Sequence, residues 1–97
     1  MTTSSVDAAT TAERVVVTDH ALTVELGDGR SISAPIEWYP RLAHATQQER
    51  DNWRLLAGGQ GIHWGDLDED ISIDSLLAGR RSAESPTSFQ RWLTGRI

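Results

Sequence analysis

The segment that decides the fold is "ALTVELGDGRSISAPI", residues 21–36. Its apolar and polar side chains alternate on both sides of Asp28-Gly29, a period of two that is typical of strands with one buried face. The Asp-Gly pair favours a tight hairpin in which both central residues take positive φ. Residues 14–19, "RVVVTD", are rich in β-branched side chains and predict a preceding strand. We therefore expect an antiparallel three-strand meander with one covered face and one face in water.

Helices are expected after the meander. Pro40 fits the first position of a short helix, where its missing N–H is not needed. The next helix is predicted by "TQQERDNWRLLAGG", residues 46–59, in which Thr46 and Glu49 have the spacing of a capping box. Apolar side chains follow at i, i+3 and i+4 from Trp53, and the closing glycines favour the left-handed residue that ends a helix.

The remaining segments predict short elements. Residues 61–64, "GIHW", indicate a short edge strand added to the meander. Residues 74–79, "DSLLAG", indicate a short helix capped by Asp74 or Ser75, with both leucines facing inward. Residues 85–95 predict a final amphipathic helix that begins with Ser-Pro. The expected fold class is α+β: a small antiparallel sheet packed against two or three helices, with a C-terminal amphipathic helix.

Length and composition indicate one domain in 97 residues. Residues 1–12 predict a disordered N-terminal lead, residues 13–79 the α+β domain, and residues 80–97 a basic linker followed by the C-terminal helix. There is no cysteine, no secretory signal and no long apolar run. We therefore expect a cytoplasmic protein without a membrane association, a metal or a cofactor.

Charge is distributed unevenly along the chain. Residues 1–79 hold thirteen acids against five arginines, whereas residues 80–97 hold four arginines against Glu84 alone. This is an acidic body with a basic end. Four of the acids lie close together in "GDLDED", and like charges this close are stabilised best opposite arginines. The candidates for that role, from the same chain or a neighbour, are Arg80, Arg81, Arg91 and Arg96.

The acidic segment has several possible chemistries. Asp66, Asp68 and Asp70 are spaced like the first ligands of a calcium loop, but Ile71 and Leu77 occupy the positions that need glycine and glutamate. Calcium in this mode is therefore disfavoured. The structural alternative is that Asp66 and Asp68 form a turn, and that Glu69 and Asp70 face water at the edge before Ile71.

Catalysis by the same segment is also weakly supported. His63 with Asp66 or Asp68 has the residue types of a general-base pair. However, no cysteine or G-x-S-x-G sequence marks a nucleophile. We therefore expect no enzymatic activity.

The aromatic stripe of the final helix needs a surface. Phe89, Trp92 and Leu93 fall on one face, and an isolated ten-residue helix is marginal in water. Three surfaces are available to it: the protein's own body, an identical neighbour in a homodimer, or a foreign protein.

The order of motifs from residue 15 to residue 79 resembles a small bacterial family, domain of unknown function 2442. The matching features are the D-G-R hairpin, "W-Y-P-R-L", "G-x-G-I-H-W", "L-D-E-D-I" and the closing "L-L-x-G". The resemblance implies a compact α+β unit and supplies no catalytic residues. Members of the family occur alone or fused to a helix-turn-helix domain, and some are predicted partners in toxin–antitoxin-like gene pairs.

The leading hypothesis is a non-enzymatic protein-interaction module, antitoxin-like or regulatory, whose partner protein is encoded nearby. An acidic domain suits a basic partner because complementary fields speed encounter. The expected contact residues are Asp66, Asp68, Glu69, Asp70, Arg80, Arg81, Phe89, Trp92 and Leu93. One alternative is a nucleic-acid-associated regulator acting through the basic tail, although the acidic body repels the same polymer. The other is a metal-assisted hydrolase that uses Asp66, Asp68 and His63.

Overall fold

The computed structural model describes residues 10–96, so most of the predicted N-terminal lead lies outside the described residues. The predicted meander is confirmed as an antiparallel sheet in the order β1 (Ala12–Val17), β2 (Ala21–Leu26) and β3 (Ser31–Pro35). Val24 in the central strand lies opposite Val15 on one side and Ile32 on the other. The alternation of the sequence therefore sets the register that points these side chains to one face.

The turn between β2 and β3 differs in detail from the expectation. Gly29 has φ +93°, but Asp28 is not in the left-handed region, so the prediction of two positive φ values is wrong. The Gly29 N–H donates to the Leu26 carbonyl at 3.1 Å, and the Leu26 N–H donates to the Arg30 carbonyl at 2.8 Å. This is the longer hairpin loop in which one left-handed glycine follows a type I turn.

A second three-strand antiparallel sheet follows in the order β4 (Trp53–Leu56), β5 (Gly61–Trp64) and β6 (Glu69–Ser72). The predicted helix through residues 52–57 is therefore wrong. Trp53 and Leu55 also fit a period of two, and in the structure they lie opposite Trp64 and Ile62 of β5. Backbone pairing with β5 outweighs the helical spacing, which is ambiguous over so few residues. The segment "GIHW" is accordingly the centre of this second sheet, not an edge of the meander.

The helices are short. They are the 3-10 helices η1 (Ile36–Trp38) and η2 (Ala57–Gly59) and the α-helices α2 (Pro40–Ala43), α3 (Gln47–Asp51), α4 (Ile73–Leu77) and α5 (Pro86–Gly95). The predicted capping box is confirmed, because Thr46 and Glu49 exchange both side-chain-to-backbone hydrogen bonds. Ser72 caps α4 in place of the predicted Asp74 or Ser75, and Leu77 is exposed, so only one of the two leucines faces inward.

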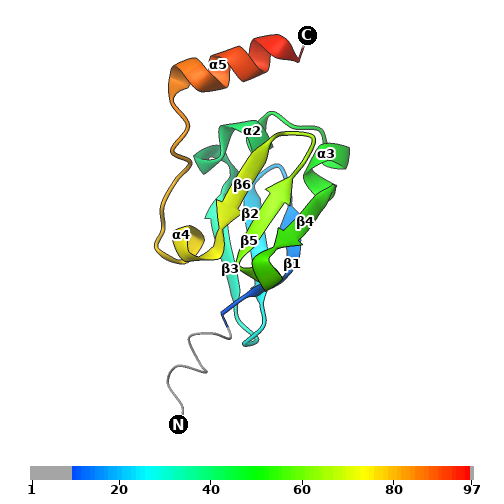
Figure 1. Ribbon diagram of the computed structural model, residues 1–97, viewed down its shortest axis with the longest axis vertical. Helices are drawn as coiled ribbons and strands as arrows, with labels where there is room; N and C mark the ends of the chain where they lie inside the picture. The colour runs from blue at the N-terminus through cyan, green and yellow to red at the C-terminus, as the bar shows by residue number, and fades with distance from the viewer. Residues whose placement is uncertain (1–9, 97) are drawn as a thin grey trace.

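The two sheets share one hydrophobic core, and Figure 1 shows β4, β5 and β6 in front of β1, β2 and β3. Trp64 is fully buried between them, and its indole N–H donates to the Arg50 carbonyl at 3.0 Å. The Arg50 side chain is itself buried and donates to the Leu42 and Ala43 carbonyls at the end of α2. This arginine therefore satisfies the carbonyl groups that a helix end leaves without partners.

The C-terminal helix α5 docks on its own body. Figure 1 shows it beyond α2, at the end of the molecule opposite the β2–β3 turn. The Phe89 ring lies 5.1 Å from the His44 ring, and Trp92 packs against the core. The Arg96 guanidinium pairs with Glu49 at 2.6 Å. Of the three surfaces that could cover the aromatic stripe, the structure shows the protein's own body. No residue of α5 is fully buried.

Candidate functional site

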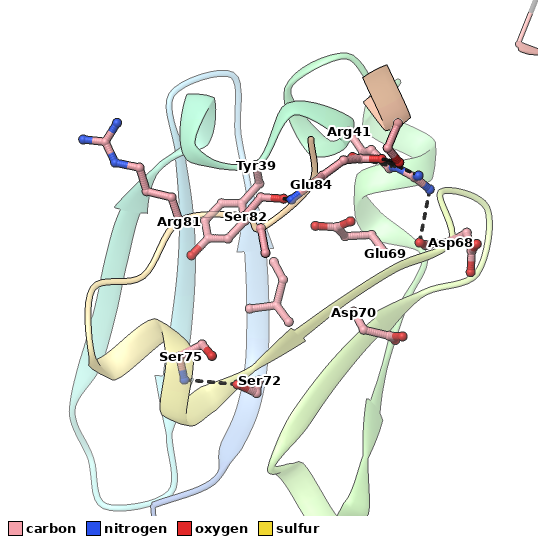
Figure 2. A pocket seen from close by; sticks show the side chains of 13 residues that line it. Tyr39, Arg41, Asp68, Glu69, Asp70, Ser72, Ser75, Arg81, Ser82 and Glu84 are labelled. Carbon is pink, nitrogen blue, oxygen red and sulfur yellow. Dashed lines mark hydrogen bonds and ion pairs between the residues drawn. The ribbon is translucent and has the colours of Figure 1, made fainter. Parts of the chain in front are cut away.

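A pocket of ≈ 540 Å³ opens between β6, the start of α2 and the segment that leads into α5 (Figure 2). Side chains from all three segments form its walls. The ones that matter for its chemistry are Tyr39, Arg41, Glu69, Ile71, Arg81 and Glu84. Segments that are distant in the sequence therefore line one acidic pocket.

Glu69 is the central feature of this pocket. In β6 the side chains alternate, so Glu69 and Ile71 face inward while Asp70 and Ser72 face outward. Figure 2 shows the Glu69 and Asp70 side chains leaving the strand in opposite directions. Glu69 is only 9 % exposed, so the expectation that it faces water beside Asp70 is wrong for this residue.

Burial is the main reason that the pKa of Glu69 is raised to about 7. Arg41 acts against this rise, whereas the negative charges of Glu84, Asp70 and Asp68 add to it. Among residues 10–96, no side-chain hydrogen bond to the Glu69 carboxyl group is found. A buried carboxylate in this position is therefore both desolvated and short of positive charge.

Arg41 pairs with Glu84 and also donates hydrogen bonds to the backbone of the turn between β5 and β6. Its Nε and Nη2 donate to the carboxylate of Glu84 at 2.5 to 3.0 Å, and both side chains are largely buried. This pairing lowers the pKa of Glu84. Its Nη1 donates to the Leu67 carbonyl at 2.8 Å and to the Asp68 carbonyl at 3.2 Å. The guanidinium thus joins the lead into α5 to the turn between β5 and β6.

The turn between β5 and β6 has a fixed shape. Leu67 is fully buried, and Asp68 has φ +50°, a left-handed conformation that Asp tolerates better than most residues. Asp66 and Asp68 on the turn are exposed, and so is Asp70 on β6. Asp66 accepts from the Asn52 amide at 3.0 Å. Three of the four predicted acids thus remain at the surface, Asp66 and Asp68 on the turn and Asp70 on β6.

The proposed catalytic group is not assembled as the sequence suggested. The His63 Nδ1 lies 2.5 Å from an Asp70 carboxylate oxygen, so this histidine pairs with Asp70 and not with Asp66 or Asp68. Within residues 10–96, no three His, Cys, Asp or Glu side chains are placed to hold a metal ion. The residues named for a metal-assisted hydrolase therefore do not form a ligand set in this part of the chain.

The predicted basic contacts have other partners. The Arg81 guanidinium lies over the Trp38 ring at 4.9 Å, and the Arg80 carbonyl accepts from the Tyr39 hydroxyl at 3.3 Å. Among residues 10–96, neither guanidinium pairs with an acid of the turn, and Arg41 is the arginine that donates to the backbone carbonyl groups of the turn.

The aromatic stripe forms part of the support of the pocket. Phe89 stacks with Trp92 at 5.8 Å, and the Arg41 guanidinium lies 5.2 Å from the Trp92 ring. Leu93 is half-buried on the same helix. The C-terminal helix therefore packs against the arginine that holds the acidic turn.

Sequence reasoning missed Tyr39, Arg41 and Glu84 as members of the site. Tyr39 and Arg41 lie in the "W-Y-P-R-L" motif, whose local signals predict only the start of a helix. For Glu69 a signal was present, because it is in phase with Ile71 and Ile73 at a spacing of two residues.

In residues 10–96 no helix has the length and apolar character needed to cross a membrane.

Two solved structures resemble this fold. A protein of unknown function from Rhodospirillum rubrum is 25% identical, with a TM-score of 0.66 over 77% of this chain and 93% of its own. An uncharacterized protein from Chromobacterium violaceum is 20% identical, with a TM-score of 0.65 over 89% of this chain and 75% of its own. No curated protein matches the sequence. These likenesses support the α+β fold and bring no activity with them.

The family model described as "Protein of unknown function (DUF2442)" matches residues 12–82, which include both sheets, α4 and most of the pocket. The resemblance suggested by the motifs of the sequence is thereby confirmed, and the chain belongs to this family.

Proposed function

We propose that this protein is a non-enzymatic protein-interaction module that binds a basic partner protein through the turn between β5 and β6. The observation that carries this proposal is the hold of Arg41 on that turn, through the Leu67 and Asp68 carbonyls. Arg41 holds the backbone of the turn from inside, the carboxylates of Asp66 and Asp70 are contacted by Asn52 and His63, and all three aspartates are exposed. A preorganised surface binds more tightly than a mobile one of the same chemistry.

The role of the C-terminal segment is revised in this proposal. Phe89, Trp92 and Leu93 are half-buried against the protein's own body, so α5 supports the acidic surface and does not offer an open apolar face. Two of the arginines that nucleic-acid binding would require are engaged, Arg96 with Glu49 and Arg81 on Trp38. These contacts favour a protein partner over a nucleic acid.

An antitoxin-like or regulatory form of this function has a simple test, since it places the partner in an adjacent gene. The tagged protein is co-expressed with the product of the neighbouring gene and purified at low and high salt. We expect the wild-type protein to retain that product at low salt, and the triple variant D66N/D68N/D70N to lose most of it. Asn suits the left-handed backbone at Asp68, so the variant keeps its fold.

The matched control is E13Q/E37Q/D74N, which removes the same number of charges from exposed acids outside the turn. It should retain the partner as the wild-type protein does. Equal retention by both triple variants, or no retention by the wild-type protein, would contradict the proposal.

A further inference from the structure

The pocket beside the acidic turn contains an ionisable group that the described contacts leave without a partner. Glu69 is nine-tenths buried and lines the pocket, yet no hydrogen bond to its side chain is found among residues 10–96. Burying a carboxylate without a partner costs several kcal/mol. A buried ionisable group without a partner that lines a pocket is a candidate for ligand binding.

The positive charge nearest to this carboxylate is already in use. Arg41 has its Nε, Nη1 and Nη2 donating to Glu84 and to two carbonyls of the turn. Arg81, at the edge of the pocket, lies on the Trp38 ring. The described cations therefore leave Glu69 without a direct partner.

The charges around Glu69 come from every element packed against it. Arg41 on α2 and Arg81 before α5 are positive, while Glu84 before α5, Asp68 in the turn and Asp70 on β6 are negative. Tyr39, which precedes α2, contributes a hydroxyl that is already donated to the Arg80 carbonyl. The four carboxyl groups that line the pocket outnumber its two guanidinium groups, so the field in the pocket favours a further cation.

The shape of the pocket suits a cation on an aliphatic stem. Its volume of ≈ 540 Å³ lies within the roughly 300–1,000 Å³ typical of small-ligand sites. Ile71 and the Tyr39 ring supply apolar wall, and serine side chains from β6, α4 and the lead into α5 supply polar rim. An apolar wall beside a buried carboxylate matches a chain of methylene groups that ends in a positive charge.

We propose that this pocket binds an alkylguanidinium or alkylammonium group, with Glu69 as the carboxylate that pairs with it. Its source is an arginine or lysine side chain of the partner protein, and in this respect the inference rests on the proposed interaction function. The pocket chemistry itself is tested with small molecules, so that its failure is distinguishable from the failure of the co-expression experiment.

The probes are n-butylguanidinium and its neutral analogue n-butylurea, titrated into ¹⁵N-labelled protein with ¹³C-labelled Glu side chains. We expect n-butylguanidinium to cause saturable shifts at the Glu69 and Ile71 amides and to lower the titration midpoint of the Glu69 carboxyl. n-Butylurea should cause neither change. Equal binding of the two probes, or an unmoved midpoint, would overturn the proposal on the wild-type protein alone.

The variant Glu69→Gln keeps the shape of the side chain and should weaken n-butylguanidinium binding by at least about tenfold, the loss expected for one charge-assisted hydrogen bond. Glu37→Gln, an exposed acid outside the pocket, should leave affinity unchanged. Thermal melts verify that both variants fold. Unchanged affinity in folded Glu69→Gln would assign binding elsewhere.

Affinity should also rise by roughly tenfold from pH 6 to pH 8, because the cation binds the ionised carboxylate and the Glu69 pKa is about 7. A flat profile over this range would contradict the assignment. The source of the cation is resolved by comparing N-acetyl-arginine-N-methylamide with putrescine. Tighter binding of the blocked arginine supports a partner side chain, whereas tighter binding of putrescine overturns that source and assigns the pocket to free amines.

Discussion

Glu69 couples the stability of this protein to pH. Its pKa is about 7 in the folded protein against an ordinary value of 4.5, so between these values the folded state holds a proton that the unfolded state releases. Stability therefore falls as pH rises through this window, and the full penalty is present above pH 7. The direction is opposite to that of a carboxylate held by an arginine, such as Glu84, whose pKa is lowered.

Replacing the Glu69 carboxyl group should remove the loss of stability that its ionisation causes at high pH. We expect Glu69→Gln to raise the free energy of unfolding at pH 8 by up to roughly 3 kcal/mol, with little change near pH 5. Urea unfolding of the wild-type protein and the variant from pH 5 to pH 8 measures the difference. Glu37→Gln is the control, and parallel stability curves for wild type and Glu69→Gln would refute the assigned cause.

The orientations and contacts of single residues are the features that the sequence predicts least well. The acidic character of "GDLDED" was visible, and three of its acids are exposed as a charge run usually is. Glu69 is the exception because the strand begins at this residue, and strand phase, not composition, turns it inward. Arg41 could not be assigned to Glu84 or to the turn, because the two lie 43 and 26 residues away along the chain.

At the scale of elements, the turn between β4 and β5 combines left-handed backbone with a close contact to β1. Ala57, Gly58 and Gly59 all have positive φ, and Gly59 lies against the first strand. A Cβ added at Gly59 would meet the Ala12 carbonyl oxygen at 2.7 Å, whereas one added at Gly58 would meet nothing within 4 Å. Comparing substitutions at the two glycines therefore separates the cost of a left-handed backbone from the cost of a steric clash.

This difference predicts the effects of two matched substitutions. Gly58→Ala should lower the free energy of unfolding by about 1 kcal/mol, the cost of a left-handed alanine. Gly59→Ala should lower it by roughly 1–3 kcal/mol more, because the added methyl group also displaces β1. Urea denaturation of both variants tests this, and equal losses would mean that β1 yields freely.

The predictability of elements depended on their length and on local signals. The meander was predicted because five- and six-residue strands show a clear period of two, and the capping box was predicted because it is local. The β4 strand has four residues, and its side chains fit both a helix and a strand. Pairing with β5, which the local sequence does not encode, decides between them.

At the scale of the whole molecule, two sheets share one core while α5 rests on the outside. The α+β class and the C-terminal helix follow from the sequence, but the division into two sheets follows from which strands pair. The division into a lead, a domain and a basic end remains a prediction. Since no residue of α5 is fully buried, its attachment should be the less stable part of this arrangement.

Amide hydrogen exchange can test this hierarchy. Trp92→Ala should speed exchange throughout α5 by roughly tenfold or more, because a ten-residue helix without its anchor is marginal in water. Exchange in β2 and β5 should change much less. Gln90→Ala, on the exposed side of the same helix, is the control. Equal effects on α5 and the sheets would show that the molecule opens as a single cooperative unit.

The position of Arg41 links ligand binding at the acidic turn to the attachment of α5, because this arginine contacts both the turn and Glu84, which precedes α5. One guanidinium is shared by Glu84, which leads into α5, and by the carbonyls of the acidic turn. Any ligand that favours this shared arrangement at the turn must strengthen the attachment of α5 by the same factor, since linkage is reciprocal. Detachment of the helix would conversely weaken the hold of Arg41 on the turn, because both contacts share one guanidinium group.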